Sequence, residues 1–241
     1  MSKIRRMNSP APRQSAHFAR YVSNYDACLN RALSPTGETT EYFARERVRW
    51  LARCLDLLGE TPRSVLDFGC GIGSTAPLLL TGLSCESVHG VDASEEVIER
   101  ARRERFAPQI HYSVVRELVP NGSFDCAYCN GVFHHIPVEE RPAALDFIRS
   151  SLRPGGLFAL WENNPWNPGT RYVMSRCEFD EDASTISPRA ARTIMKRAGL
   201  NVVRSDFLFF VPRSLSALRP IEPLLRKVPL GGQYQVLCRK P

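Results

Sequence analysis

From residue 64 onward, short apolar runs alternate with longer amphipathic segments. The runs have the length of buried strands, and the segments between them place apolar residues at helical spacing. Strands that alternate with helices predict an α/β fold, in which a parallel sheet is joined by right-handed crossovers. The predicted strands are 64–68, 87–91, 110–114, 124–130, 157–162, 201–211 and 233–239.

Three main helices are predicted between these strands, at 94–105, 137–152 and 187–198. The third has well-marked ends, because Ser187 can cap its first turn and Gly199 suits the position just after its last turn. The chain has 241 residues and shows no internal repeat, so one domain with short additions accounts for it.

The residues before the first strand do not follow this alternation. Residues 1–16 are rich in Ser, Pro, Arg and Gln and are predicted to form a disordered basic arm. Residues 17–60 are predicted to form a helical cap of two helices. The first, around 17–33, has Tyr25 on its apolar face, and the second ends at Gly59. The apolar stripe of the second helix consists of Ala44, Val48, Leu51, Leu55 and Leu58.

A glycine-rich turn directly follows the first predicted strand. Gly69, Gly71 and Gly73 occupy alternate positions, Cys70 lies between the first two, and Asp67 precedes them. Glycine permits positive φ and close approach of the backbone to a ligand. The carboxylate of Asp67 would repel a pyrophosphate but would suit a cationic ligand. The turn therefore indicates a nucleotide-type cofactor and disfavours an NAD-dependent dehydrogenase.

A second acidic residue, Asp92, ends the second predicted strand about 20 residues further on, the spacing of a carboxylate that binds both ribose hydroxyls. With these features the chain resembles the class I S-adenosylmethionine-dependent methyltransferases. Its nearest likeness is to the small-molecule group that includes the ubiquinone-biosynthesis O-methyltransferases. The resemblance covers most of residues 64–162 and rests on Asp67-x-Gly69-x-Gly71-x-Gly73, Asp92, Ser123-Phe124-Asp125, His134-His135-Ile136 and Leu152-Arg153-Pro154-Gly155-Gly156.

The resemblance implies a Rossmann-like sheet of seven strands, mostly parallel with an antiparallel last strand, with helices on both faces. It also implies that residues 61–241 form the methyltransferase domain and that the N-terminal cap folds over the cofactor. The implied cofactor is S-adenosyl-L-methionine. Residues 214–231 would be a lid-like insert between the last two strands.

The same resemblance assigns roles to the cofactor-binding residues. Asp67 would lie near the ammonium group of the cofactor, Asp92 would bind its ribose, and Ala93 would lie beside its adenine. The backbone of the glycine turn, with Gly69, Cys70, Gly71 and Gly73, would contact its amino-acid portion. The backbone of Cys129 and Asn130 would meet the methionyl group, and Tyr25 would either approach that group or belong to the core.

One expected feature is absent from the chain. The family commonly has an Asp soon after the third strand that reaches the adenine amino group, whereas residues 113–118 offer Arg116 or Glu117 as substitutes.

Two adjacent histidines, His134 and His135, follow the fourth predicted strand. Imidazole can act as a general base near physiological pH, so either could take a proton from an acceptor. The alternative is that one of them hydrogen-bonds the loop. The ubiquinone O-methyltransferases resemble this loop but carry acidic residues where this chain has Gly131 and His134, so metal dependence is not implied.

The loop after the fifth predicted strand is a candidate acceptor site, because parallel α/β folds bind ligands beyond the carboxyl ends of their strands. Glu162, Asn163 and Trp166 belong to it, and we expect Asn163 to hydrogen-bond the acceptor and Trp166 to stack on it. The alternative is a turn fixed by Pro165 and Pro168.

The net charge of +7 resides in the ends of the chain. Residues 1–20 hold five Lys or Arg and no acid, and residues 212–241 hold six against Glu222 alone. Basic ends could bind RNA or an anionic membrane surface, but short charged ends are more often only solvated. In the insert, basic residues alternate with apolar ones that could contact a membrane, cover an acceptor or pack as a lid. These apolar residues are Leu215, Leu218, Ile221, Leu225 and Val228.

The eight cysteines are scattered along the chain, which favours a reducing compartment. Cys126 and Cys129 have the spacing of a metal or redox pair. However, positions three apart in a strand face opposite sides, so buried structural thiols are expected. The chain has no long apolar run and no apolar signal-peptide core, which indicates a cytoplasmic protein.

The sequence therefore predicts methyl transfer from S-adenosylmethionine to a small-molecule or lipid-like acceptor by in-line displacement. An RNA methyltransferase that uses the basic ends is an alternative, and so is a non-catalytic protein that binds the cofactor. The acceptor and the oligomeric state are left open.

Overall fold

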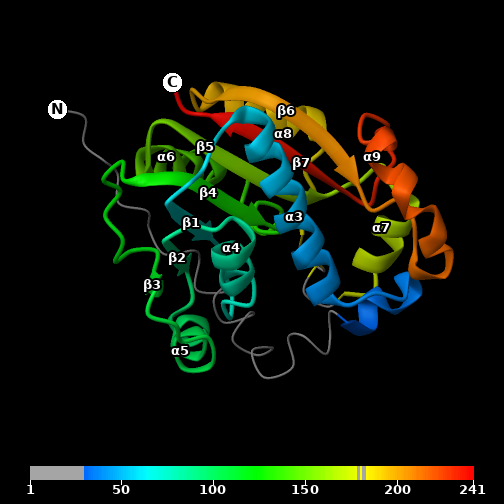
Figure 1. The fold of residues 1–241 in the computed structure, drawn as a ribbon, viewed down its shortest axis with the longest axis horizontal. Coiled ribbons are helices and arrows are strands. Elements are labelled where there is room, and N and C mark those ends of the chain that lie inside the picture. Colours follow the sequence, from blue (N-terminus) through cyan, green and yellow to red (C-terminus); the bar gives the residue numbers. More distant parts are fainter. Residues whose placement is uncertain (1–29, 178–179, 181–182) are drawn as a thin grey trace.

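The computed structural model describes residues 30–177, 180 and 183–241. Seven strands form one sheet in the order β3-β2-β1-β4-β5-β7-β6 (Figure 1). The strands are β1 Ser64–Phe68, β2 Ser87–Asp92, β3 Ile110–Val114, β4 Phe124–Asn130, β5 Leu152–Asn163, β6 Asn201–Leu208 and β7 Gln233–Arg239.

Strands β1 to β5 pair in parallel, whereas β7 runs antiparallel to both of its neighbours, β5 and β6. The predicted seven-stranded, mostly parallel sheet with an antiparallel last strand is therefore confirmed. Because the parallel strands end at the same edge of the sheet, the loops after β1, β2, β4 and β5 meet there.

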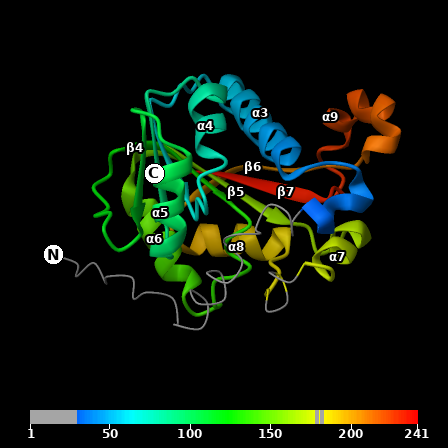
Figure 2. The same cartoon turned by 90° about the horizontal axis from the view of Figure 1, so that it is seen from below.

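Helices cover both faces of the sheet, as predicted (Figure 2). Buried residues of α3, α4 and α5 pack in one core, and buried residues of α6 and α8 pack in the other. The α-helices are α3 Thr40–Leu58, α4 Ala76–Gly82, α5 Glu95–Glu104, α6 Arg141–Ser151, α7 Pro168–Met174, α8 Pro188–Arg197 and α9 Glu222–Leu225. The 3-10 helices are η1 Ser34–Thr36 and η3 Arg213–Ile221.

The predicted end of α3 at Gly59 and the predicted cap of α8 at Ser187 are confirmed, whereas Thr39, the cap of α3, was not predicted. Thr39 accepts a hydrogen bond from the backbone of Tyr42 at the start of α3, and Gly59 ends that helix with a φ of 68°. Ser187 caps α8 in the same way. The predicted arm 1–16, and Tyr25 with it, lie outside the described residues.

Three predicted boundaries were wrong. Helix α6 begins at Arg141 rather than residue 137, because the four residues before it form a turn closed by a hydrogen bond from the Glu140 amide to the Pro137 carbonyl. Strand β5 begins at Leu152, which pairs with Phe124. Strand β6 ends at Leu208 because Phe209 takes a φ of 66°, which an extended strand cannot accommodate.

Cys126 and Cys129 point to opposite faces of the sheet and are fully buried in the two separate cores. Burial raises the pKa of the Cys126 thiol to about 12, so this group is a poor metal ligand or nucleophile. The two cysteines are therefore structural thiols, as predicted. No helix among the described residues is long and apolar enough to cross a bilayer.

Candidate active site

The glycine turn after β1 has a strained backbone that only glycine adopts easily. Gly69, Gly71 and Gly73 all have positive φ, at 73°, 55° and 75°. A Cβ atom at Gly69 would collide with Val132, and one at Gly73 would lie 2.6 Å from the Tyr112 hydroxyl. A Cβ at Gly71 would meet nothing within 4 Å. Two of the glycines therefore permit close packing, and the third leaves open space above the turn.

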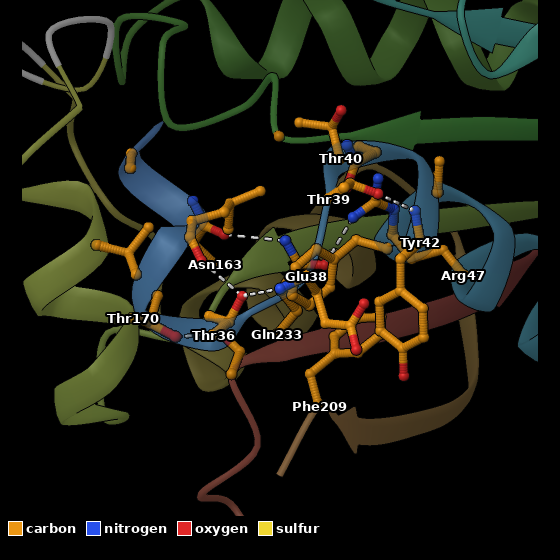
Figure 3. A pocket seen from close by; sticks show the side chains of 18 of the residues that line it. Thr36, Glu38, Thr39, Thr40, Tyr42, Arg47, Asn163, Thr170, Phe209 and Gln233 are labelled. Atoms are coloured by element: carbon orange, nitrogen blue, oxygen red, sulfur yellow. Dashed lines mark hydrogen bonds between the residues drawn. The ribbon is translucent and has the colours of Figure 1, made fainter. Parts of the chain in front are cut away.

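That open space belongs to a cavity of about 1060 Å³, bounded by segments far apart in the sequence. The glycine turn forms one wall, the start of α3 another, and the loops after β4 and β5 a third. Figure 3 shows side chains from α3, from the β5 and β7 ends and from the segment after β6 converging on it. The cavity exceeds the volume that one drug-sized ligand requires, so it can hold a cofactor and a second molecule together.

Asp67 presents a buried carboxylate to this cavity. The residue is 2% exposed, and its Oδ2 atom has no hydrogen-bond partner among the described residues. Burial, together with the nearby charge of Asp92, raises the pKa of Asp67 to about 7, although Arg47 opposes this shift. A buried carboxylate without a partner is costly, so its presence indicates a cationic ligand.

Arg47 of α3 also lines the cavity, and it was not identified as a site residue from the sequence. Its guanidinium donates to the Tyr128 hydroxyl at 3.1 Å and to Gln233 Oε1 at 3.0 Å, and Gln233 donates in turn to Asn163 (Figure 3). Within the described part of the chain no carboxylate forms an ion pair with it. The sequence did contain a sign of a special role for Arg47, because this charged residue interrupts the apolar stripe of α3.

His134 is almost fully buried between two carboxylates. Its Nδ1 atom lies 2.6 Å from Glu162 Oε2, and its Nε2 atom lies 3.4 Å from Asp180 Oδ1. Burial favours the neutral ring, but Glu162 and Asp180 outweigh that effect and raise the pKa of His134 to about 10. The shift therefore favours the positively charged ring of His134, with a proton on both nitrogens, at neutral pH when no other cation is bound. Like Arg47, Asp180 was not identified from the sequence.

His135 lies beside His134, with ring centroids 4.1 Å apart, and is partly exposed. Its Nε2 atom lies 3.6 Å from Asp180 Oδ1. Both histidines and Asp180 line the cavity, so the structure brings the predicted histidine pair to the same space as Asp67.

Comparison with known proteins identifies the family. A methyltransferase-domain family model matches residues 39–205, more than half of the chain. The chain belongs to the S-adenosylmethionine-dependent methyltransferases. A trans-aconitate 2-methyltransferase from Azoarcus is 34% identical over 172 residues, which cover 68% of this chain and 62% of that protein. The chain therefore spans less than two thirds of the length of that relative.

Two solved structures share the fold of this methyltransferase. One, from Thermotoga maritima, is described as a possible histamine N-methyltransferase. It has a TM-score of 0.65 at 20% identity and covers 94% of this chain and 99% of its own. The other is magnesium protoporphyrin IX methyltransferase from Synechocystis with bound S-adenosylmethionine. Its TM-score is 0.58 at 17% identity, covering 98% of this chain and 100% of its own.

The cavity of this chain fits the amino-acid end of S-adenosylmethionine. That end carries one ammonium and one carboxylate group, and the cavity offers the unpaired carboxylate of Asp67 and the guanidinium of Arg47. Asn130 adds a buried Oδ1 atom without a hydrogen-bond partner in the described part of the chain. These polar groups would gain hydrogen-bond partners from a ligand that has both a donor and an acceptor.

Four of the predicted cofactor residues, Gly73, Asp92, Ala93 and Cys129, do not line this cavity. Asp92 accepts hydrogen bonds from the backbone amides of Gly71 at 3.1 Å and Ser94 at 3.0 Å, so its side chain holds the glycine turn against β2. Ala93 packs beside the second core, and the Cys129 side chain is buried in that core. Neither of the predicted adenine substitutes lines the cavity, since Arg116 pairs with Glu95 and Glu117 accepts from the Val114 amide.

The predicted acceptor residues occupy three different environments. Asn163 lines the cavity, whereas Glu162 is 1% exposed and lies behind His134. Trp166 is 42% exposed and lies outside the cavity lining. Asn164, which the sequence analysis passed over, is fully buried and donates to the Pro229 and Gly231 carbonyls, so it fixes the loop against the chain before β7.

Proposed function

We propose that this protein transfers the methyl group of S-adenosylmethionine to a small polar molecule that enters the same cavity. The observation that carries the proposal is the continuity of the cavity. One wall presents Asp67 and Gly71, and another presents His135 and Asn163. A reaction between cofactor and acceptor requires both in one water-excluding space, with the reacting atoms held in line.

The chain's own residues would hold the cofactor by charge and shape. Asp67 would pair with its ammonium and Arg47 with its carboxylate, while the open space at Gly71 would admit it close to the backbone. When bound, the cofactor supplies an electrophilic methyl group on a positively charged sulfur. The protein's contribution would be largely positional, because the leaving thioether needs no proton.

On the acceptor side, the two histidines differ in what they can do. Both ring nitrogens of His134 face carboxylates, so neither is free to take a proton from an acceptor. His135 is partly exposed and lines the cavity, which makes it the better placed of the two. A carboxylate acceptor would need no base at all, because it is already ionised at neutral pH.

We infer that small carboxylic acids are the first acceptor class to test. The relative from Azoarcus is named for trans-aconitate, and the acceptor wall here carries groups that hydrogen-bond oxygen, including Thr170, Asn163 and Gln233. Of these, Gln233 is tied to Arg47, so an acid bound there would lie near a buried positive charge.

The decisive experiment separates cofactor binding from methyl transfer. Calorimetry with S-adenosylhomocysteine is expected to show one site in the wild type. A charged hydrogen bond is worth about 1.5–3 kcal/mol, so Asp67→Asn should weaken binding by roughly 10- to 150-fold. Asp56→Asn, an exposed change on the outer face of α3, is the matched control and should leave affinity unchanged.

Methyl transfer is then measured with labelled cofactor and pools of small acids, alcohols and amines. Label in an acid fraction supports the proposal. Tight binding of S-adenosylhomocysteine without transfer to any pool would instead favour a non-catalytic cofactor-binding protein, and failure to bind would remove the proposal altogether.

A further inference from the structure

His134, His135 and Asp180 form a compact cluster that we call the histidine–aspartate cluster. Each offers one metal-ligating atom, and these three atoms all lie within 4.8 Å of one another. The geometry points to a binding site for a divalent first-row transition metal ion, held by His134 Nε2, His135 Nε2 and the Asp180 carboxylate. Neither the family nor the sequence analysis implied a metal here.

The spacing is compatible with shared ligation of one ion. Asp180 Oδ1 lies 3.4 Å from His134 Nε2 and 3.6 Å from His135 Nε2. A charge-assisted hydrogen bond would shorten either distance to about 2.7–2.9 Å. Two ligands held tetrahedrally at about 2.1 Å from one ion are about 3.4 Å apart, close to both observed distances.

Glu162 orients the cluster from behind. Its Oε2 atom lies 2.6 Å from His134 Nδ1, and its Oε1 atom accepts the Phe133 amide at 2.9 Å. A ring that donates Nδ1–H to a carboxylate presents an unprotonated Nε2 lone pair on its far side, which is the usual arrangement behind a metal-bound histidine. In this position Glu162, predicted as an acceptor contact, is a positioning residue.

Contacts at Ser184 hold the chain close after Asp180 beside the histidines, although 45 positions separate Asp180 from His135 in the chain. The Ser184 amide donates to the His134 carbonyl at 2.8 Å. Arg141 donates to the Phe133 and Ser184 carbonyls, at 3.1 and 2.8 Å, and so ties the two segments together. The juxtaposition is therefore supported by contacts that do not involve the three ligand atoms.

The three ligand atoms determine which metal ions suit this cluster. Two imidazoles and one carboxylate suit Zn²⁺, Fe²⁺ or Co²⁺, whereas Mg²⁺ and Ca²⁺ prefer oxygen ligands alone. Three protein ligands leave at least one coordination position open, and all three residues line the cavity. An acceptor oxygen could occupy that position. This role rests on the proposed function, but binding of the ion itself does not.

Cobalt is the probe, because its visible absorption reports the ligand set. Chelator-treated protein titrated with Co²⁺ is expected to bind one equivalent with a visible absorption band. His135→Gln and Asp180→Asn should each weaken this binding by at least about tenfold. His111→Ala is the matched control and should leave it unchanged, since it removes an exposed histidine from the other described histidine pair, whose rings are 6.2 Å apart.

S-adenosylhomocysteine affinity measured on the same samples keeps the two proposals separate. The His111→Ala control should bind it within about twofold of the wild type, and measurable binding by His135→Gln and Asp180→Asn shows that these two variants fold. Absence of stoichiometric Co²⁺ uptake by the wild type, or uptake that both variants retain, overturns the metal site. Failure of the wild type to bind S-adenosylhomocysteine while it still takes up Co²⁺ would instead overturn the proposed methyl transfer.

Discussion

Asp67, which we propose binds the cofactor, works against the stability of the free protein. Its raised pKa means that the folded chain holds a proton that the unfolded chain has released, between pH 3.8 and about 7. In that window the unfolded state binds fewer protons, so the free energy of unfolding falls as pH rises. Above pH 7 the buried charge is fully formed and its cost is constant.

Replacing Asp67 with Asn should remove the loss of stability that its buried charge causes. The difference in free energy of unfolding between Asp67→Asn and the wild type is expected to increase from pH 4 to pH 7. The increase should be up to about 4 kcal/mol, at 1.36 kcal/mol per pKa unit, with little change above pH 8. Urea denaturation of the cofactor-free proteins at several pH values measures it. A difference that stays flat over this range would contradict the raised pKa.

Two glycines of the turn should respond differently to the same substitution. Gly71→Ala requires only an unfavourable φ, at a cost of about 1–2 kcal/mol, and its methyl group would enter the cavity and weaken cofactor binding. Gly69→Ala adds a collision with Val132 and should destabilise the protein further. Thermal unfolding and S-adenosylhomocysteine titration of both variants test this. Equal losses of stability would show that Val132 moves aside.

At the scale of elements, α3 positions Arg47 in the cavity while its apolar stripe packs on the first core. Thr39 caps the helix end nearest the cavity, where its hydroxyl accepts the Tyr42 amide. We expect Thr39→Ala to lower the free energy of unfolding by about 1 kcal/mol. Thr40→Ala, at the next position, should cost less because its side chain makes no capping bond. Urea denaturation compares them, and an equal cost for both would argue against the cap.

At the scale of the whole molecule, η3 and α9 gather with α7 and the start of α3 at one end (Figures 1 and 2). This insert exposes several large apolar side chains, with Leu224 79% exposed. Two of its basic residues form ion pairs, Arg219 with Glu38 and Lys227 with Asp206. The first of these pairs ties the insert to the segment that precedes α3, which favours a lid over a membrane contact.

We therefore expect residues 30–241 to show no binding to vesicles rich in anionic lipid, even at low salt where electrostatic attraction is strongest. Sedimentation with such vesicles measures it, and the full chain serves as the comparison because it adds the basic residues 3–20. Co-sedimentation of residues 30–241 would show that the exposed apolar side chains bind lipid without help from paired charges.

The sequence by itself determined the elements and the turn. Alternating apolar runs located all seven strands, and the glycines with Asp67 located one wall of the cavity, because these signals depend on neighbouring residues. Tertiary structure alone decided which side chains come together: Arg47 and Asp67 in one cavity, Glu162 behind His134, and Asp180 beside both histidines. Local periodicity specifies which face of an element is buried, but contacts between residues far apart in sequence follow from how the buried faces pack.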